Sequence, residues 1–534
     1  MSVATSYPLF EKLDSEFRKT SKILFGDEIG PLKEFTGYLS EQMQMPRKFP
    51  SGSGKDVYLT GQGYFPSSKF ASFDEIDWGR KFEPLGINEI KDIDSIARAL
   101  REKFVYTGNV VLGKSANVEK STNVTDSFFV YNSSFISNCE YVAYTSFSRN
   151  CRHLFGTHDT ADSTFLMSAM NVGGHGCSRI FESSLMSDCS DIFYSYSMLG
   201  CQKCCFSFFQ RGKRYRIGNL QLDQQKYARL ESSLTEQMRD DLQKKRSTYR
   251  LMDIFRAKKK SGGIKLGSLD LPTYDENKAR EAAESAFMDT TKVLLGKELF
   301  PLDDFGPWLT ASVDFYEFLP ERSPVTGKDI FAVKKYWKYE ELKGVFVGDE
   351  GEKLGDFSLS GEEISGNLRE MVQNSARIAF LTTYISQNCT NIDAPLTCVD
   401  SANSYRTIMP VYTKNTAFSF WPRESANIFG STCAFKSSFC MKSSYSQGLI
   451  RAFEVDSAYS SSDLYFCHNV EGLSNGMFCF NVKSMRNAIG NAEYGKESYM
   501  KVKNSLMEQI AGELESKKTL RWSIYSIGAH EAGK

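Results

Sequence analysis

A six-residue period over residues 115–139 constrains this chain more than any other feature. The stretch SANVEKSTNVTDSFFVYNSSFISNC places a small side chain at every sixth residue and an aliphatic side chain halfway between. An amphipathic helix mixes spacings of three and four, and a half-buried strand alternates with a period of two, so neither template fits. A fixed short period indicates a solenoid, in which each coil contributes the same inward side chains and stacks on the coil before it.

The repeat predicts which side chains form the core. After Gly173 and Gly174 the pattern resumes two residues out of phase, so we expect a bulge or a corner adjustment at this glycine pair. Cysteines recur twelve residues apart before and after this glycine pair, and again near the other end of the chain. This spacing predicts that two hexads form one structural unit. The predicted inward residues are Ser115, Val118, Ser121, Val124, Ser127, Val130, Ser133, Ile136, Cys139, Cys151, Cys177, Cys189, Cys201, Cys467 and Cys479.

The thirteen cysteines are interpreted as small apolar core residues that share their positions with Ser and Thr. A metal site is the first alternative, but only Cys201 and Cys204 have the C-x2-C spacing and no second pair follows. Disulfide or redox roles are the other alternative. We expect stacked thiols, and neither a metal nor another cofactor.

The chain contains an internal duplication. A second ladder runs through Ser425, Ser431, Ser437 and Ser443. Residues 213–242 then align without a gap on residues 485–514 at an offset of 272, with ten identities. Each copy ends in a short strand and a helix with apolar residues on one face. Because the last coil of a solenoid exposes strand edges and an apolar end, we expect these helices to be caps or partner-binding faces. Their face residues are Tyr227, Leu230, Leu234, Tyr499, Val502 and Leu506.

The two ladders and their exits also carry a resemblance to known sequences. The runs CQKCCFSFFQRGKRYRIGN and CHNVEGLSNGMFCFNVKSMRNAIGN resemble uncharacterised Cys- and Tyr-rich β-solenoid repeat proteins of small-genome bacteria and archaea and of environmental sequences, whose ladders end in a K-x-Y-x-I-x-N exit. The resemblance covers under half of the chain. Those proteins often carry zinc-ribbon cysteine pairs, which this sequence lacks. The resemblance implies the fold and no activity.

These observations predict a mainly β chain with two tandem β-solenoid units of hexad repeats, each followed by a capping helix and preceded by a mixed α/β segment. The predicted segments are an N-terminal mixed and helical segment (1–108), the first β-solenoid (109–212), its exit strand and capping helix (213–246), a linker with a mixed α/β segment (247–380), the second β-solenoid (381–484), and a final exit strand, capping helix and tail (485–534).

Three motifs suggest other functions. The run GNVVLGKS at 108–115 matches the phosphate-binding loop pattern, but its valines and leucine favour an extended chain and no helix is expected after it. The basic run at Lys258–Lys260 is interpreted as a solvated linker, with a nucleic-acid-binding arm as the alternative. His153, His158 and His175 are candidate metal ligands or catalytic residues, because hexapeptide-repeat acyltransferases and metal hydratases place histidines between coils.

Composition narrows the classes of function. The 65 basic residues balance the 65 acidic ones, so no net field attracts nucleic acid or an anionic membrane. We expect no signal peptide and no membrane insertion. Aromatic residues such as Phe129, Tyr141 and Tyr144 form either an internal column or an outer stripe. We therefore expect a non-catalytic structural or protein-interaction subunit, cytoplasmic or in a virion, with protein partners or self-association. A solenoid enzyme using the three histidines is the alternative.

Overall fold

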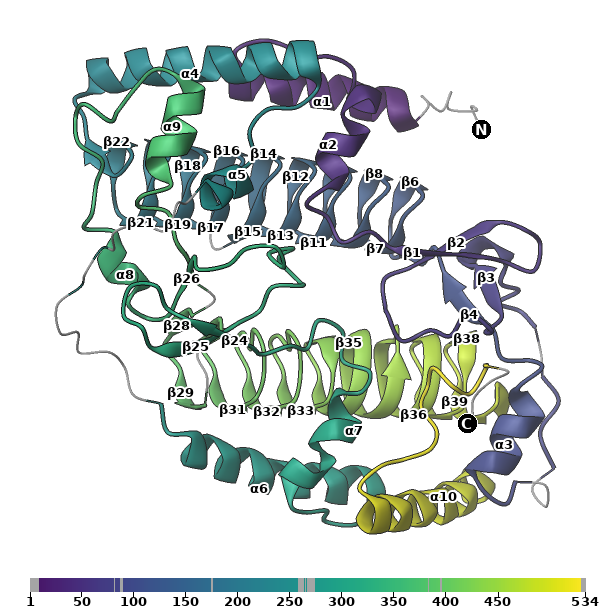
Figure 1. The fold of residues 1–534 in the computed structure, drawn as a ribbon. Coiled ribbons are helices and arrows are strands. Elements are labelled where there is room, and N and C mark those ends of the chain that lie inside the picture. Colours follow the sequence, from purple (N-terminus) through teal and green to yellow (C-terminus); the bar gives the residue numbers. More distant parts are fainter. Residues whose placement is uncertain are drawn as a thin grey trace. The chain divides into compact units, whose positions relative to one another are not determined.

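The computed structural model describes residues 9–80, 82–86, 90–173, 176–257, 264, 266, 274–382, 384–393 and 396–529. The fold is mainly β, as predicted, with long parallel sheets of many strands that are compatible with a solenoid-like architecture (Figure 1). The chain divides into two compact units that are interleaved along the sequence. Unit 1 comprises residues 1–46, 110–271 and 317–383, and unit 2 comprises residues 47–109, 272–316 and 384–534. No helix among the described residues is long and apolar enough to span a membrane.

Two parallel sheets form the centre of unit 1, and we call their strands ladder region 1. Successive strands alternate between the sheets, so each strand pairs with the next but one along the chain. The first sheet contains β6 (Ala116–Glu119), β8 (Phe128–Tyr131), β10 (Glu140–Ala143), β12 (Arg152–Phe155), β14 (Ser163–Met167), β16 (Cys177–Phe181), β18 (Ser190–Phe193), β20 (Gln202–Cys205), β22 (Arg214–Ile217) and the antiparallel β23 (Leu220–Gln221). The second contains β5 (Val111–Leu112), β7 (Thr122–Thr125), β9 (Ser134–Ser137), β11 (Ser146–Arg149), β13 (His158–Ala161), β15 (Met170–Gly173), β17 (Ser184–Ser187), β19 (Tyr196–Leu199) and β21 (Phe208–Arg211).

The pairing register of ladder region 1 is twelve residues. In the first sheet Val118 pairs with Val130, and Val130 pairs with Val142. In the second sheet Val124 pairs with Ile136. The aliphatic half of the hexad repeat therefore alternates between two columns, and these side chains share one buried cluster with the cysteines. Between β14 and β16, and between β15 and β17, the register widens to fourteen residues, because the two additional residues of the phase shift lie between these paired strands.

The backbone bends at every third residue. From Asn117 through His153, every third residue has a positive φ between 45° and 61°. This left-handed conformation costs roughly 1–2 kcal/mol for most L-residues and less for Asn and Asp. Asparagine is frequent at these positions and adds side-chain ladders. Asn138 Nδ2 donates to Asn150 Oδ1 at 2.9 Å, one coil further along.

The small residues of the hexad repeat bridge segments twelve residues apart by hydrogen bonds. Ser133 Oγ accepts from the backbone N of Thr145 at 3.1 Å and donates to the backbone O of Tyr131 at 2.8 Å. Cys189 Sγ likewise accepts from the backbone N of Cys201, at 3.4 Å. A small side chain that both donates and accepts therefore suits this position, which explains why Ser and Cys exchange along the column.

Helices cover one side of ladder region 1. The helix α1 (Leu9–Phe25) crosses the first sheet and contacts β8 through β16. Phe17 packs on Phe155 with ring centroids 5.2 Å apart, and Phe25 packs on Phe181 at 4.9 Å. Within unit 1, η1 (Leu32–Phe35) and α2 (Thr36–Ser40) precede the ladder strands, and α4 (Gln224–Lys245) follows them and contacts β22 and α1. The short α5 (Leu251–Arg256) comes next.

Residues 317–383 complete unit 1. They form the hairpin β24 (Leu319–Arg322) and β25 (Asp329–Ala332), then β26 (Phe346–Val347), α8 (Gly351–Leu354), α9 (Leu368–Ser375) and β27 (Leu381–Thr382), which pairs in parallel with β26.

Unit 2 contains a second set of parallel strands, which we call ladder region 2. Its strands also pair twelve residues apart, as at Thr416 and Ile428. They are β28 (Ser386–Gln387), β29 (Thr390–Ile392), β30 (Cys398–Val399), β31 (Ala402–Tyr405), β32 (Lys414–Ala417), β33 (Ala426–Phe429), β34 (Thr432–Phe435), β35 (Ser438–Asp456), β36 (Tyr459–Glu471), β37 (Ser474–Met477), β38 (Phe480–Lys483), β39 (Arg486–Ile489) and the antiparallel β40 (Ala492–Glu493).

The remaining elements of unit 2 surround ladder region 2. The helix α6 (Glu276–Leu295) crosses β29 to β35. It is followed by η3 (Leu302–Phe305) and α7 (Gly306–Thr310), and α10 (Lys496–Lys517) packs on β39 and α6. Residues 47–109 supply β1 (Arg47–Pro50), β2 (Asp56–Leu59), β3 (Phe70–Ser72), η2 (Phe73–Glu75), α3 (Ile93–Leu100) and β4 (Tyr106–Gly108).

Candidate functional site

Two of the candidate histidines of ladder region 1, His153 and His158, do not converge. His153 lies in β12 and His158 in β13, which belong to different sheets, and His175 lies outside the described residues. His153 stacks between Tyr141 and Phe165, with ring centroids 5.1 and 4.5 Å away. Burial lowers the pKa of His153 to about 4. This ring is one layer of an aromatic column on left-handed positions outside the internal cluster.

His158 is fully buried in the second sheet. Its Nδ1 lies 2.8 Å from Ser146 Oγ, and its ring lies 4.5 Å from the ring of Tyr336. Burial, with a smaller effect of Lys338, lowers the pKa of His158 to about 3. Over the described parts of the chain, no group of three or more His, Cys, Asp and Glu side chains is placed to hold a metal ion.

The ladder cysteines are buried, and all of those named from the sequence are free thiols. Burial raises the pKa of Cys139, and that of Cys177 to about 11, so these thiols stay protonated at neutral pH. One pair differs: Cys389 and Cys398, which begin ladder region 2, form a disulfide. The thiol-only interpretation therefore does not extend to this end of the ladder.

The predicted cap-helix faces are occupied within the chain. Tyr227 and Leu234 of α4 are buried, Leu230 is half-buried, and Tyr227 Oη lies 3.5 Å from Cys205 Sγ. In α10, the side chains of Tyr499, Val502 and Leu506 are buried. Asp223 caps α4 by accepting from the backbone N of Lys226, whereas Gly495 offers α10 no side-chain cap.

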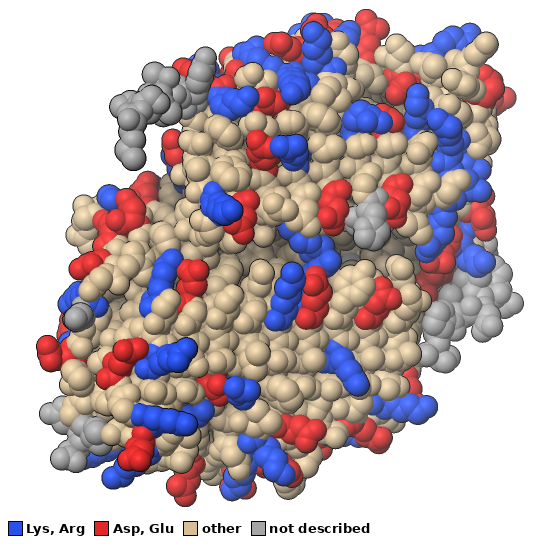
Figure 2. Space-filling model, turned by 180° about the vertical axis from the view of Figure 1, so that it is seen from behind, with Lys and Arg blue, Asp and Glu red and all other residues tan. Residues whose placement is uncertain are grey.

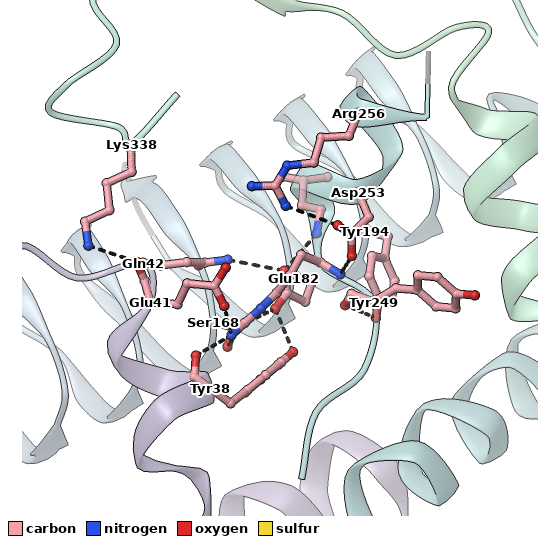
Figure 3. Close-up of polar contacts among 12 residues, drawn as sticks. Tyr38, Glu41, Gln42, Ser168, Glu182, Tyr194, Tyr249, Asp253, Arg256 and Lys338 are labelled. Carbon is pink, nitrogen blue, oxygen red and sulfur yellow. Dashed lines mark hydrogen bonds and ion pairs between the residues drawn. The ribbon is translucent and has the colours of Figure 1, made fainter. Parts of the chain in front are cut away.

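A dense polar cluster surrounds Glu182, directly after β16 (Figure 3). Its carboxylate is fully buried and accepts hydrogen bonds from Tyr38 Oη at 2.7 Å, Arg250 Nη1 at 2.9 Å, the backbone N of Leu251 at 2.8 Å and Gln42 Nε2 at 3.3 Å. Burial raises the pKa of Glu182, against the lowering effect of Arg250 and of these bonds. A saturated carboxylate has no lone pair left to hold a ligand.

Arg250 links three segments of unit 1 at this cluster. Its guanidinium lies 3.4 Å from the centroid of the Tyr38 ring, pairs with Glu41 at 2.7 Å and bonds Ser168 Oγ at 3.3 Å. Burial acts to lower the pKa of Arg250, but Tyr38 and Glu182 raise it overall, so the side chain stays charged. The cluster therefore joins α2, the ladder and α5.

Unit 2 has a buried glutamate at the duplication offset, with a cation from another position of the chain. Glu454 stands 272 residues after Glu182, is fully buried and accepts from the backbone N of Ile524 at 2.9 Å. Its cation is Lys442, whose Nζ lies 3.7 Å away and 5.3 Å from the centroid of the Trp308 ring. Burial raises the pKa of Glu454 and lowers that of Lys442.

A second buried cluster of unit 2 contains an aspartate–histidine pair. His468 Nδ1 donates to Asp456 Oδ2 at 2.8 Å, and this oxygen also accepts from Tyr64 Oη at 2.5 Å. His468 Nε2 accepts from the backbone N of Thr107 at 2.8 Å. A catalytic base needs a free nitrogen facing its substrate, whereas both nitrogens of this ring are engaged inside the protein.

Sequence reasoning missed all three clusters. Glu182, Glu454 and Asp456 interrupt the hexad pattern without belonging to any motif, and their partners are distant in the chain. The offset of 272 was the available signal, because it places a glutamate at the same step of both ladders. Comparison with known protein families, curated proteins and solved structures finds no match to this chain.

Proposed function

We propose that this chain is a duplicated β-solenoid that serves as a non-catalytic structural or protein-interaction subunit of a larger assembly, in the cytoplasm or in a virion. The twelve-residue register of both ladder regions supports the solenoid, and the buried glutamates at one offset support the duplication. The resemblance to Cys- and Tyr-rich repeat proteins is consistent with it.

One observation supports the non-catalytic role: among the described residues, the carboxylate of Glu182 and both ring nitrogens of His468 are engaged in buried contacts within the protein. Glu182 accepts four hydrogen bonds, His468 engages both ring nitrogens, and His153 and His158 lie on different sheets. These contacts fix helices and loops to the strands, which favours a rigid framework.

Surface charge fits protein association better than nucleic-acid binding. On the face in Figure 2, basic side chains are interspersed with acidic ones rather than gathered in a single-sign patch. Several oppositely charged pairs lie one coil apart, such as Arg451 and Asp463 at 2.6 Å. Such pairs neutralise the field that would attract a polyanion. Lys258–Lys260 lie outside the described residues.

The test is the mass of the native chain over a range of concentrations. We expect sedimentation to give a mass above 60.3 kDa that rises with concentration. A constant 60.3 kDa would contradict self-association and require another protein as the partner. Zinc analysis tests the enzymatic alternative: about one tightly bound zinc per chain that is lost in His158→Ala would favour a metal-dependent solenoid enzyme.

A further inference from the structure

Each ladder region is completed by a segment from the opposite half of the chain. The first half, up to residue 257, contains ladder region 1, yet its residues 47–109 belong to unit 2. The second half, from residue 274, contains ladder region 2, yet its residues 317–383 belong to unit 1. We call residues 47–109 exchange segment A and residues 317–383 exchange segment B.

The two exchange segments have the same order of elements. Each begins with an antiparallel hairpin, β1 with β2 in segment A and β24 with β25 in segment B. A strand, a short helix and a longer helix with a capping side chain follow, and the last strand pairs in parallel with the earlier one. Both hairpin turns contain Gly-Lys-Asp with a left-handed glycine, at Gly54 and Gly327. The segments are thus equivalent parts of the two copies.

Exchange segment A is fixed to ladder region 2 by buried contacts. The backbone N of Thr107 in β4 donates to His468 Nε2 at 2.8 Å, and Thr107 Oγ1 donates to Asn481 Oδ1 at 2.6 Å. Tyr64 Oη donates to Asp456 at 2.5 Å. The ring of Phe104 lies 4.5 Å from that of Phe480.

Exchange segment B makes equivalent contacts with ladder region 1. Tyr196 stands 272 residues before His468, and its Oη donates to the backbone O of Thr382 in β27 at 2.6 Å. Asn219 Nδ2 donates to the backbone O of Phe357 at 2.8 Å. At Gly355 a Cβ would lie 2.0 Å from the backbone O of Phe209, so the segment lies directly on β21.

We propose that these ladder surfaces are protein-binding sites for the exchange segment of the other half, so that the chain is a covalently joined, reciprocally exchanged pair. Exchange of an equivalent element between two copies preserves every contact of the element while tying the copies together. The inference rests on the duplication proposed above, but not on the proposed role in a larger assembly. The proposal predicts that neither half of the chain contains every segment of the unit to which its ladder region belongs.

The experiment cuts the full chain at a protease site inserted between residues 257 and 274. We expect the two fragments to stay together at the mass of the uncut chain in native buffer and to separate only in denaturant. Separation of the fragments in native buffer would overturn the proposal.

A cross-link distinguishes exchange from simple docking of two complete halves. The side chains of Arg211 and Glu352 form an exposed ion pair between ladder region 1 and exchange segment B. In the cut protein, Arg211→Cys with Glu352→Cys and a short bis-maleimide is expected to join the fragments on a denaturing gel. The matched control, Lys297→Cys with Glu515→Cys, replaces an exposed ion pair within the second half and is expected to leave them separate. Failure of the first pair to join the fragments would overturn the proposal.

Discussion

At the scale of single residues, burial controls which side chains keep a charge. Ladder positions are enclosed by neighbouring coils, so a polar side chain there stays neutral or needs a bonded partner of opposite charge. His158 and Glu182 illustrate the two outcomes: the histidine stays neutral against Ser146, whereas the glutamate is bonded by Arg250.

We predict that His158 makes stability fall in acid. Its pKa is about 3 in the folded chain and about 6.5 when unfolded, so between these values only the unfolded state binds the proton. The contribution is complete above about pH 6.5 and is lost progressively as the pH falls toward 3, about 2 kcal/mol of it by pH 5. Urea unfolding at pH 7.5 and 5 is expected to show a smaller difference in His158→Gln than in the unsubstituted chain. An unchanged difference would contradict the assignment.

We predict that Glu182→Gln destabilises unit 1 by about 3–5 kcal/mol, because it removes the buried countercharge of Arg250 and leaves this guanidinium with the exposed carboxylate of Glu41. Glu41→Gln is the matched control. It removes a carboxylate from the same guanidinium, but the Glu41 side chain is 56% exposed, so we expect a loss below about 1 kcal/mol. The loss of stability in each variant is measured from the shift of its urea unfolding midpoint relative to the unsubstituted chain. Equal losses would show that the buried cluster is not what fixes α2 and α5.

At the scale of elements, the hexad repeat predicts the columns but not the bends. Spacing alone indicated stacking of Val118, Val130 and Val142, because inward positions of a regular coil must recur. The left-handed bends could be predicted only in part. Asn and Asp, which favour this conformation, recur at multiples of three, but Phe and Tyr occupy other positions of the same series and do not indicate a bend.

The bridging hydroxyl gives an element-scale prediction. Ser195 Oγ accepts from the backbone N of Ser207 at 3.1 Å and donates to the backbone O of Phe193 at 2.8 Å. Ser195→Ala leaves both groups without this partner and is expected to cost about 1–3 kcal/mol, whereas Ser195→Cys is expected to cost less. The control Ser187→Ala, whose hydroxyl bonds only the exposed Asp188, is expected to stay within about 0.5 kcal/mol. Thermal unfolding measures all three, and a harmless Ser195→Ala would contradict the bridging role.

At the scale of the whole molecule, the repeat could not reveal which segments complete which ladder. The equivalence of the two halves is visible at the offset of 272, but a duplicated sequence is equally compatible with two separate copies and with exchanged ones. The choice depends on contacts such as Thr107 with His468, between residues far apart in the chain. The predicted sequential segments therefore differ from the interleaved units. The buried clusters stayed hidden for the same reason.

The return of the backbone every twelve residues underlies all of these conclusions, and spin labels measure it most directly. Gln202 and Arg214 are exposed and are paired in neighbouring strands, β20 and β22. Labels on Gln202→Cys and Arg214→Cys are expected to show strong spin–spin broadening, because paired strands lie about 5 Å apart, and each single-label variant is expected to lack it. A helix would separate the two backbone sites by about 18 Å and one continuous strand by about 40 Å. An unbroadened spectrum with separations of that size would contradict the coil.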